Sequence, residues 1–498
     1  MDHDLLVDPL LTWRDTERRR GKTTLPGLLA RLATGELGDF ARVRAHQFHP
    51  WCMFLTQLAA IALHRAGSAD PRLSDEGWRE LLLGLTGGRH EPWSVVVEDL
   101  GRPAFFQPPV PEGTVDGWKR CESPDDIDIL VTAKNHDVKA GVVRGEDLEG
   151  WVYAIATLQT MQGYPGRGYT RVARMKGGYG NRPRVGRASD HGLASRFLRD
   201  VEVLLTVWPG LLERGYRDDG VALVWAEPWD GGTSLAMGDL APHFIEVCWR
   251  VRCRPTAYGP HWLYTTTRSR RCLPEVDDGD VGDPWIPVGR AAGGALTVGS
   301  RGFDYRLLVQ LLFEADFEPA AAQKPREGDG DPVLFLASAL ARGQGKTQGL
   351  HERTLTLSGE ARLKIGQPDT RASLGRRASE RVLAADRMRS KVLFPALKQI
   401  ALGDRVVDDE FTARVDDMFF DHLFATLDQS DDEAKFAFDR RLGGIAWTEL
   451  QRAIEQCSVA DARKFKAISE AEGVFRGCLK KNFPDLVAVQ AKDEGASS

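Results

Sequence analysis

Residues 410–427, EFTARVDDMFFDHLFATL, carry the clearest structural pattern in this chain. Apolar side chains recur at intervals of three and four residues and form one stripe: Phe411, Val415, Met418, Phe419, Leu423 and Leu427. Such spacing predicts an amphipathic helix with one buried face. Further helical blocks lie near 372–402, 432–457 and 460–482, and the connections between the blocks are short. Four amphipathic helices joined in this way predict a four-helix bundle.

Upstream of about residue 370 the chain mixes helical and β-like segments. Helices are expected after the N-cap candidate Thr24 and near 51–67, 78–88, 151–162 and 195–215. A strand is expected over 4–14, and short β-like runs between about 220 and 310 predict a mixed sheet region. The fold class is therefore α+β. We expect a large mixed N-terminal domain with irregular sheets and long loops over 1–368, followed by the helical bundle over 369–498.

Composition narrows the class of protein. The 498 residues carry a formal net charge of −5, with 42% hydrophobic and 28% charged residues, which is ordinary for a soluble globular protein. This charge excludes a uniformly basic nucleic-acid binder but allows a local basic patch. The seven cysteines are scattered and no pair has C-x-x-C spacing, so neither a disulfide framework nor a zinc site is expected. Without a signal peptide or a long apolar run, the expected location is the cytoplasm, away from membranes.

Catalytic motifs are mostly lacking. Two GKT triplets resemble the end of a phosphate-binding loop, but Thr16 and Leu340 stand where its first glycine is required. Neither G-x-S-x-G nor H-E-x-x-H occurs. The usual support for an ATP-binding protein, a serine hydrolase or a zinc protease is therefore missing, and no cofactor or metal is expected.

The segment MQGYPGRGYTRVARMKGGYGNRP, residues 161–183, has an unusual composition. Between Gly150 and Ser189 the chain has seven Arg or Lys residues and no Asp or Glu, although the whole protein is acidic. Glycines let a backbone approach another molecule closely, and arginines pair with phosphates. These features favour a cradle for a polyanion such as nucleic acid. The alternative is a solvated basic loop, or one that packs on an acidic face of the same protein.

The order of several motifs resembles the CasA family, the large subunit of type I-E CRISPR Cascade complexes. The motifs are LLVDPLLTW and TTLPGLLARL near the N-terminus, PAFFQP (103–108), AIATLQTMQGYPGRG (154–168), MKGGYGNRP (175–183), and DPWIPV (283–288) followed by ALTV. The resemblance implies a complex with guide RNA and backbone subunits. It also implies recognition of the protospacer-adjacent motif in double-stranded target DNA, help with strand separation, and docking of a helicase–nuclease. It implies no catalytic site.

The resemblance also implies particular residues. The family's glycine loop, which lies on the DNA minor groove, falls within 163–182, in either GYPGRG or KGGYG: Gly163, Gly166, Arg167, Gly168, Arg174, Lys176, Gly177, Gly178, Tyr179 and Arg182. The family's wedge aligns with Lys346, Thr347 and Gln348, at an expected hairpin tip. Its loop that contacts the guide aligns with Lys134, Asn135, His136 and Lys139.

One departure from the family concerns its lysine finger. This sequence has no lysine between Lys176 and Lys324, so Arg268, Arg270 or Arg271 would replace it. An arginine presents more donors in a fixed fork than a lysine does, so the base preference could differ.

The basic run 371–391 in the bundle is a further candidate site. It contains seven basic and two acidic residues. It is either a solvated helix face or a phosphate-binding face made by Arg376, Arg377, Arg381 and Arg387.

Two other functional classes remain open at this point. One is a nucleic-acid-processing enzyme, such as a nuclease, with its site in the sheet region. The other is a structural scaffold that does not contact DNA.

Overall fold

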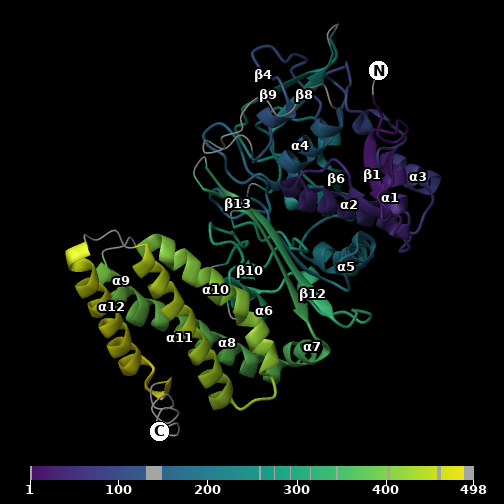
Figure 1. The fold of residues 1–498 in the computed structure, drawn as a ribbon. Coiled ribbons are helices and arrows are strands. Elements are labelled where there is room, and N and C mark those ends of the chain that lie inside the picture. Colours follow the sequence, from purple (N-terminus) through teal and green to yellow (C-terminus); the bar gives the residue numbers. More distant parts are fainter. Residues whose placement is uncertain are drawn as a thin grey trace. The chain divides into compact units, whose positions relative to one another are not determined.

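The structure is a computed structural model, and it divides into two units. It describes residues 3–130, 148–256, 259–273, 275–276, 278–291, 293–313, 316–343, 346–400, 404–456 and 461–486. The N-terminal unit comprises residues 1–302 and 316–357, and the C-terminal unit comprises 303–315 and 358–498 (Figure 1). The domain boundary expected after residue 368 stays a prediction.

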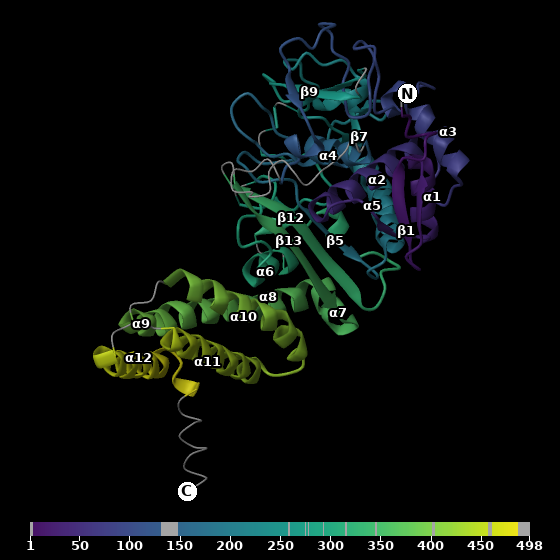
Figure 2. The same cartoon turned by 45° about the horizontal axis from the view of Figure 1, so that its top comes forward.

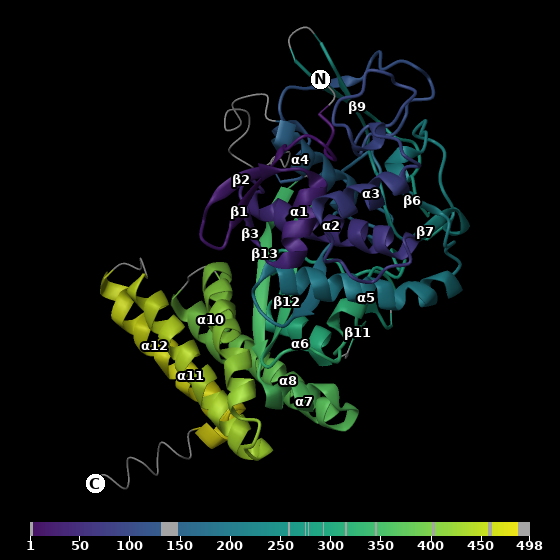
Figure 3. The same cartoon turned by 90° about the vertical axis from the view of Figure 1, so that its right-hand side faces the viewer.

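The helices expected in the N-terminal unit are confirmed. They are α1 (Leu25–Thr34), α2 (Ala45–Arg65), α3 (Asp75–Leu85), α4 (Leu148–Met161) and α5 (Leu193–Glu213). The Thr24 hydroxyl caps α1 by accepting a hydrogen bond from the Gly27 amide at 3.1 Å. Helix α2 is buried on most sides, because α3, α4 and α5 all pack against it. Figure 3 shows α1, α2 and α3 next to one another. Short 3-10 helices span Glu91–Trp93, Pro124–Asp126, Val224–Ala226, Met237–Asp239 and Ala321–Gln323.

Small sheets replace the single mixed sheet region that the sequence suggested. One sheet has the order β2-β1-β3, from Arg20–Thr23, Leu11–Asp15 and Leu37–Phe40. A second has the order β4-β9-β8, from Lys119–Cys121, His261–Thr265 and Arg250–Arg254. Two-stranded sheets join β6 (Val221–Leu223) to β7 (Leu240–Ile245), and β10 (Val288–Gly289) to β11 (Phe317–Glu318). The first strand is shorter than expected, because residues 4–10 form turns and a single bridge.

The longest strands form a hairpin. Strands β12 (Val333–Gly343) and β13 (Lys346–Leu357) pair antiparallel along their whole length, and β5 (Arg184–Ala188) adds to the other edge of β12. The pairing of β12 with β5 joins segments about 150 residues apart in sequence. Figure 1 shows the hairpin in green, running through the N-terminal unit.

The C-terminal unit confirms the four expected helical blocks. The first is α8 (Pro368–Met388), which continues through a π-helical turn (Arg389–Leu393), α9 (Phe394–Leu397) and a 3-10 turn (Lys398–Ile400). The others are α10 (Asp404–Ala425), α11 (Asp431–Glu455) and α12 (Asp461–Asn482), and two short helices, α6 (Tyr305–Phe313) and α7 (Gly359–Gly366), join this unit. Figure 2 shows α8, α10, α11 and α12 side by side.

The apolar stripe of α10 is the core of this bundle. Phe411, Val415, Phe419 and Leu423 are completely buried, and only Met418 is half-buried. The Phe419 ring stacks on Tyr305 at 4.9 Å between centroids. The same ring meets Phe438 of α11 edge-on at 5.7 Å. The helical period read from residues 410–427 therefore identified the buried face.

Candidate nucleic-acid interface

The glycine-rich stretch 162–183 leaves α4, turns, and comes back to it. The Arg182 amide donates to the Met161 carbonyl at 3.0 Å, and the Tyr164 amide donates to the Gly178 carbonyl at 3.1 Å. A Cβ on Gly163 would lie 2.1 Å from the Gly180 carbonyl oxygen. Glycine is therefore required at 163 because the two arms of the stretch approach each other there.

The turn between these arms presents an open backbone. Gly177 and Gly178 are exposed, and no atom lies within 4 Å of a Cβ built on either. Gly178 has a φ of +108°, which side chains rarely adopt. In the other candidate half of the stretch, Arg167 is exposed while Gly166 and Gly168 are half-buried. Both halves thus stay candidates for the glycine loop.

Two arginines of the stretch are not at the surface, which corrects their expected role. The Arg174 guanidinium lies 2.6 Å from Glu246 and 3.0 Å from Asp283. Arg182 lies 2.5 Å from the same Asp283 carboxylate and also donates to the Gln57 side chain at 3.2 Å. Both arginines are at most 3% exposed, and burial lowers the pKa of Arg182 to about 10. The prediction that they hold DNA phosphates is therefore wrong in this structure. Their charges are neutralised by two buried acids.

The sequence reasoning missed Glu246 and Asp283 as the partners of these arginines. The alternative that the stretch packs on an acidic surface of the same protein is confirmed for this pair of arginines. No local signal indicated the partners, because they follow the stretch by about 70 and 100 residues.

Only one of the three arginines expected to replace the lysine finger is exposed. The Arg268 side chain is 76% exposed and pairs with Asp230 at 3.1 Å. Arg270 is half-buried and donates to the Val276 carbonyl at 2.7 Å. Arg271 is buried and donates to the Pro228 carbonyl at 3.0 Å, so its assignment as a DNA contact is wrong here. Of the three, Arg268 is best placed to reach another molecule.

The end of the β12–β13 hairpin carries the expected wedge residues. Lys346 pairs with Gly343 at the last described position of the register, which confirms the expected hairpin. Lys346 and Gln348 are exposed, whereas Thr347 is half-buried and donates to the Leu130 carbonyl at 3.3 Å.

The structure brings these segments together around the glycine-rich stretch. From the hairpin, the Leu340 carbonyl accepts from the Asn181 side chain at 3.3 Å, and Arg342 donates to the Gln162 side chain at 3.3 Å. From the segment between the end of β9 and Arg268, the Thr267 amide donates to the Gly168 carbonyl at 2.8 Å. The proposed guide-contact residues Lys134, Asn135, His136 and Lys139 lie outside the described residues.

The basic helix α8 belongs to the C-terminal unit, and only part of its predicted face is open. Arg376 and Arg387 are exposed. Arg377 donates to the Asp431 carboxylate at 2.9 Å and to the Thr426 carbonyl at 2.7 Å, so it is already held. Arg381 is 3% exposed, donates to the Thr426 hydroxyl at 2.8 Å, and has its pKa lowered to about 10 by burial. Its assignment as a phosphate contact is wrong in this structure.

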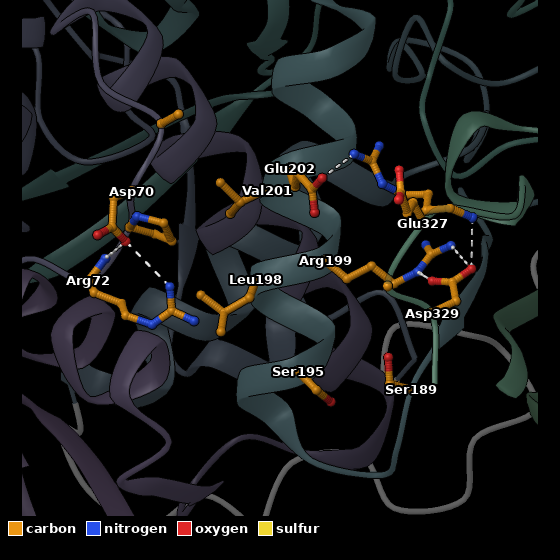
Figure 4. Close-up of a pocket in the computed structure, with 14 residues that line it drawn as sticks. Asp70, Arg72, Ser189, Ser195, Leu198, Arg199, Val201, Glu202, Glu327 and Asp329 are labelled. Carbon is orange, nitrogen blue, oxygen red and sulfur yellow. Dashed lines mark hydrogen bonds and ion pairs between the residues drawn. The ribbon is translucent and has the colours of Figure 1, made fainter. Parts of the chain in front are cut away.

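A groove of about 570 Å³ in the N-terminal unit offers a different kind of site (Figure 4). Its charged groups pair with one another: Arg199 with Asp329 at 2.7 Å, and Arg326 with Glu202. This pairing leaves no excess of positive charge for a nucleic-acid backbone.

The part of the chain that the structure describes contains neither a metal-binding cluster nor a membrane-spanning helix. There, no three His, Cys, Asp or Glu side chains group in a way that could hold a metal ion. Among the same residues, no helix has the length and apolar character needed to cross a membrane.

Comparison with known proteins connects this geometry to a fold. No protein-family model and no curated protein matches the chain. Solved structures do match: Thermus thermophilus CasA (Cse1) is 14% identical, with 97% of this chain and 100% of that chain covered and a TM-score of 0.65. Cse1 from Acidimicrobium ferrooxidans is 15% identical, with 98% and 99% covered and a TM-score of 0.62. The chain has the CasA (Cse1) fold.

The CasA fold extends over both units, and the resemblance read from the motif order is confirmed at this level. A chain of a structure named "CRISPR RNA-guided surveillance complex" also matches, at 16% identity, with 95% and 99% covered and a TM-score of 0.51. Because these identities are low, the CasA likeness describes the fold, and the roles of single residues rest on the contacts described above.

Proposed function

We propose that this protein is the large subunit of a type I-E CRISPR RNA-guided surveillance complex, with guide RNA and backbone subunits as partners. In this role it recognises the protospacer-adjacent motif in duplex DNA and helps to separate the strands. It then docks a helicase–nuclease for antiviral defence, and it has no catalytic site of its own.

The main support for the proposal is that two other segments contact the glycine-rich stretch. They are the β12–β13 hairpin and the segment that leads to Arg268, and the resemblance to CasA had implied a DNA contact for all three segments. The glycine-rich stretch touches the β12–β13 hairpin through Gln162 and Asn181, and it touches the segment after β9 through Gly168. A reader of duplex DNA needs a backbone that can approach base edges, cations for the flanking phosphates and an element at the point of strand opening. The CasA fold adds support, since it is shared over nearly the whole chain.

The exposure of each residue in the proposed interface suggests its role in DNA binding. Gly177 and Gly178 offer a backbone edge to the minor groove, where A·T and G·C pairs differ mainly by one donor. The exposed Arg167 holds phosphates together with Lys176, which is half-buried and also donates to the Gly293 carbonyl at 3.3 Å, and Arg268 takes the place of the lysine finger. Lys346 and Gln348 act at the first base pairs to open. In the C-terminal unit, Arg376 and Arg387 hold phosphates of the displaced strand.

The Gly177→Asp substitution tests motif reading. Gly177 is exposed, has open space for a Cβ and does not have a left-handed φ, so Asp adds charge without backbone strain. In the assembled complex, we expect this variant to lose motif-dependent binding of a duplex target. A target whose strands are already open next to the motif should restore binding, because guide pairing then no longer waits for motif reading.

The matched control is Gly84→Asp, since Gly84 is also exposed and also has space for a Cβ. It should bind both targets as the unmodified complex does. Motif-dependent binding by Gly177→Asp at the unmodified level would contradict the proposal. Metal-dependent cleavage of labelled duplex by the pure protein would favour the nuclease alternative instead.

A further inference from the structure

Three aromatic side chains from separate segments gather beside the glycine-rich stretch. The ring of Tyr169 stacks on Trp249 at 4.3 Å between centroids, with 26° between the planes. Tyr264 of β9 stacks on the same indole at 5.6 Å, also with 26° between the planes. The two tyrosine rings are 6.2 Å apart, farther than either is from Trp249. The indole is therefore the shared partner of a pair of tyrosines.

A lysine joins the three rings and completes what we call the Tyr169 cluster: Lys119, Tyr169, Trp249 and Tyr264. The strand register places Lys119 of β4 directly opposite Tyr264. The Lys119 ammonium is 6.0 Å from the Tyr169 ring centroid and 5.9 Å from that of Tyr264. It is also 3.5 Å from the Tyr169 hydroxyl. One cation thus serves two aromatic rings.

The cluster lies at the outer end of an aromatic row that begins in the core. Trp262 is two residues before Tyr264 on β9, so the two side chains point to the same face of the sheet. Trp262 is buried and stacks almost parallel on Trp151 of α4, at 4.5 Å and 8°. By contrast, Tyr169, Trp249 and Tyr264 are half-buried and Lys119 is exposed. The outer rings therefore share a sheet face with this buried pair and remain partly open to solvent.

The position of the Tyr169 cluster and the charges around it indicate which class of ligand it could bind. Tyr169 belongs to the glycine-rich stretch, two residues after the exposed Arg167. The Gly168 carbonyl binds the Thr267 amide at 2.8 Å, which fixes the stretch to the segment that follows Tyr264. Aromatic faces next to exposed cations are the combination that holds single-stranded nucleic acid, because each base offers a π-face and each phosphate a negative charge.

We propose that the Tyr169 cluster stacks an unpaired base of single-stranded nucleic acid, with Lys119 and Arg167 near the adjoining phosphates. This deepens the proposed function, on which it rests, by naming an unpaired nucleotide as a ligand of the same region. Stacking of this kind tolerates any base, so the site holds a strand without reading its sequence.

Photocrosslinking of the full-length chain tests the proposal. The probe is a short single-stranded oligothymidylate with one 5-iododeoxyuridine, which crosslinks to aromatic side chains that stack on it. We expect mass spectrometry to locate the crosslink at Tyr169, Trp249 or Tyr264. Competition should depend on the base: an abasic oligonucleotide of equal charge should compete roughly tenfold less well than oligothymidylate.

Substitutions within and outside the Tyr169 cluster test whether the crosslink depends on it. Tyr264→Leu and Lys119→Glu should each reduce crosslinking several-fold, and Phe465→Leu, at an 82% exposed aromatic of the C-terminal unit, should not. Lys119→Glu keeps all three rings and changes an exposed side chain, so it remains informative if Tyr264→Leu fails to fold. Crosslinks elsewhere, equal competition by the abasic strand, or an unchanged yield in Lys119→Glu would overturn the proposal. The probe contains no duplex and no motif, so its result is separate from the motif-reading test.

Discussion

Arg174 and Arg182 show how a residue type can mislead when its burial is unknown. Their setting is a run of seven cations without an acid, which in sequence resembles a phosphate-binding surface. In the structure they share Asp283, and Arg174 also binds Glu246. Two positive and two negative charges then balance inside the N-terminal unit. These arginines hold the glycine-rich stretch in place, and the exposed Arg167 is left as a candidate for DNA contact.

The first prediction at this scale concerns Arg174. Arg174→Ala leaves Glu246 and Asp283 buried with one cation fewer, and breaking a buried ion pair in this way costs roughly 3–5 kcal/mol. We expect the free energy of unfolding, measured with urea, to fall by about this amount. Arg174→Met together with Glu246→Gln should recover part of the loss, because it removes one charge of each sign.

Arg167→Ala is the control for this prediction. It alters an exposed side chain and should leave the unfolding free energy within about 0.5 kcal/mol of the unmodified protein. In the assembled complex it should instead weaken binding to all duplexes about equally. A stable Arg174→Ala with weakened DNA binding would show that Arg174 contacts phosphate after all.

At the scale of elements, helices were predictable and strand pairing was not. The stripe from Phe411 to Leu427 repeats with a helical period, and its members other than the half-buried Met418 are buried as that period requires. Period alone does not name a strand's partner, which for β12 is β5, about 150 residues earlier. Likewise β4, a strand of three residues, pairs with β9 across more than 130 residues. Residues 295–299 have a strand-like composition, yet no strand forms there; Ala295 makes an isolated bridge to Val288.

The candidate site was predictable to a similar degree. The order of motifs selected the glycine-rich stretch, the Arg268 segment and the hairpin, and in the structure each of the last two contacts the glycine-rich stretch. Exposure within each segment was not predictable, because it depends on distant partners such as Glu246 for Arg174 and Thr426 for Arg381. The Tyr169 cluster was missed for the same reason, since its four members come from four segments of the chain.

The hairpin end carries the prediction at the scale of elements. Lys346 belongs to the last described pair of β12 and β13, and Gln348 lies two residues farther along β13; both are exposed polar side chains. Opening a base step costs on the order of a few kcal/mol. The two side chains can offset part of this cost by replacing hydrogen bonds that the bases lose when they unpair. With Lys346, Thr347 and Gln348 all changed to Ala, we expect slower unpairing next to the motif, followed with a fluorescent base, and nearly unchanged first binding.

Thr354→Ala with Thr356→Ala provides the control, because both are exposed on the same strand, β13, far from its hairpin end. This pair should unpair DNA at the unmodified rate. Loss of first binding with normal unpairing in the triple variant would contradict the wedge assignment.

At the scale of the whole molecule, the two units can be followed separately. Twelve of the thirteen tryptophans lie in the N-terminal unit, and Trp447 alone lies in the C-terminal unit. Tryptophan fluorescence therefore reports mainly on unfolding of the N-terminal unit. Among the buried histidines of that unit are His49 and His243, which make its stability depend on pH.

Burial lowers the pKa of His49 to about 3 and that of His243 to about 4, from an ordinary value of 6.5. Between pH 6.5 and 4 the unfolded chain therefore binds protons that the folded unit does not. Stability is full above pH 6.5 and falls as the pH decreases, by up to ~1.4 kcal/mol per pH unit for each histidine. Urea unfolding between pH 7.5 and 5, followed by tryptophan fluorescence, should show this decline before most carboxylates titrate.

The His243→Gln variant should reduce the slope of the unfolding free energy against pH by about one proton, because glutamine does not titrate. Glutamine is a suitable replacement, since its amide can still donate to the Leu204 carbonyl, which His243 Nε2 contacts at 2.8 Å. A slope that is unchanged in this variant would mean that His243 is charged in the folded protein.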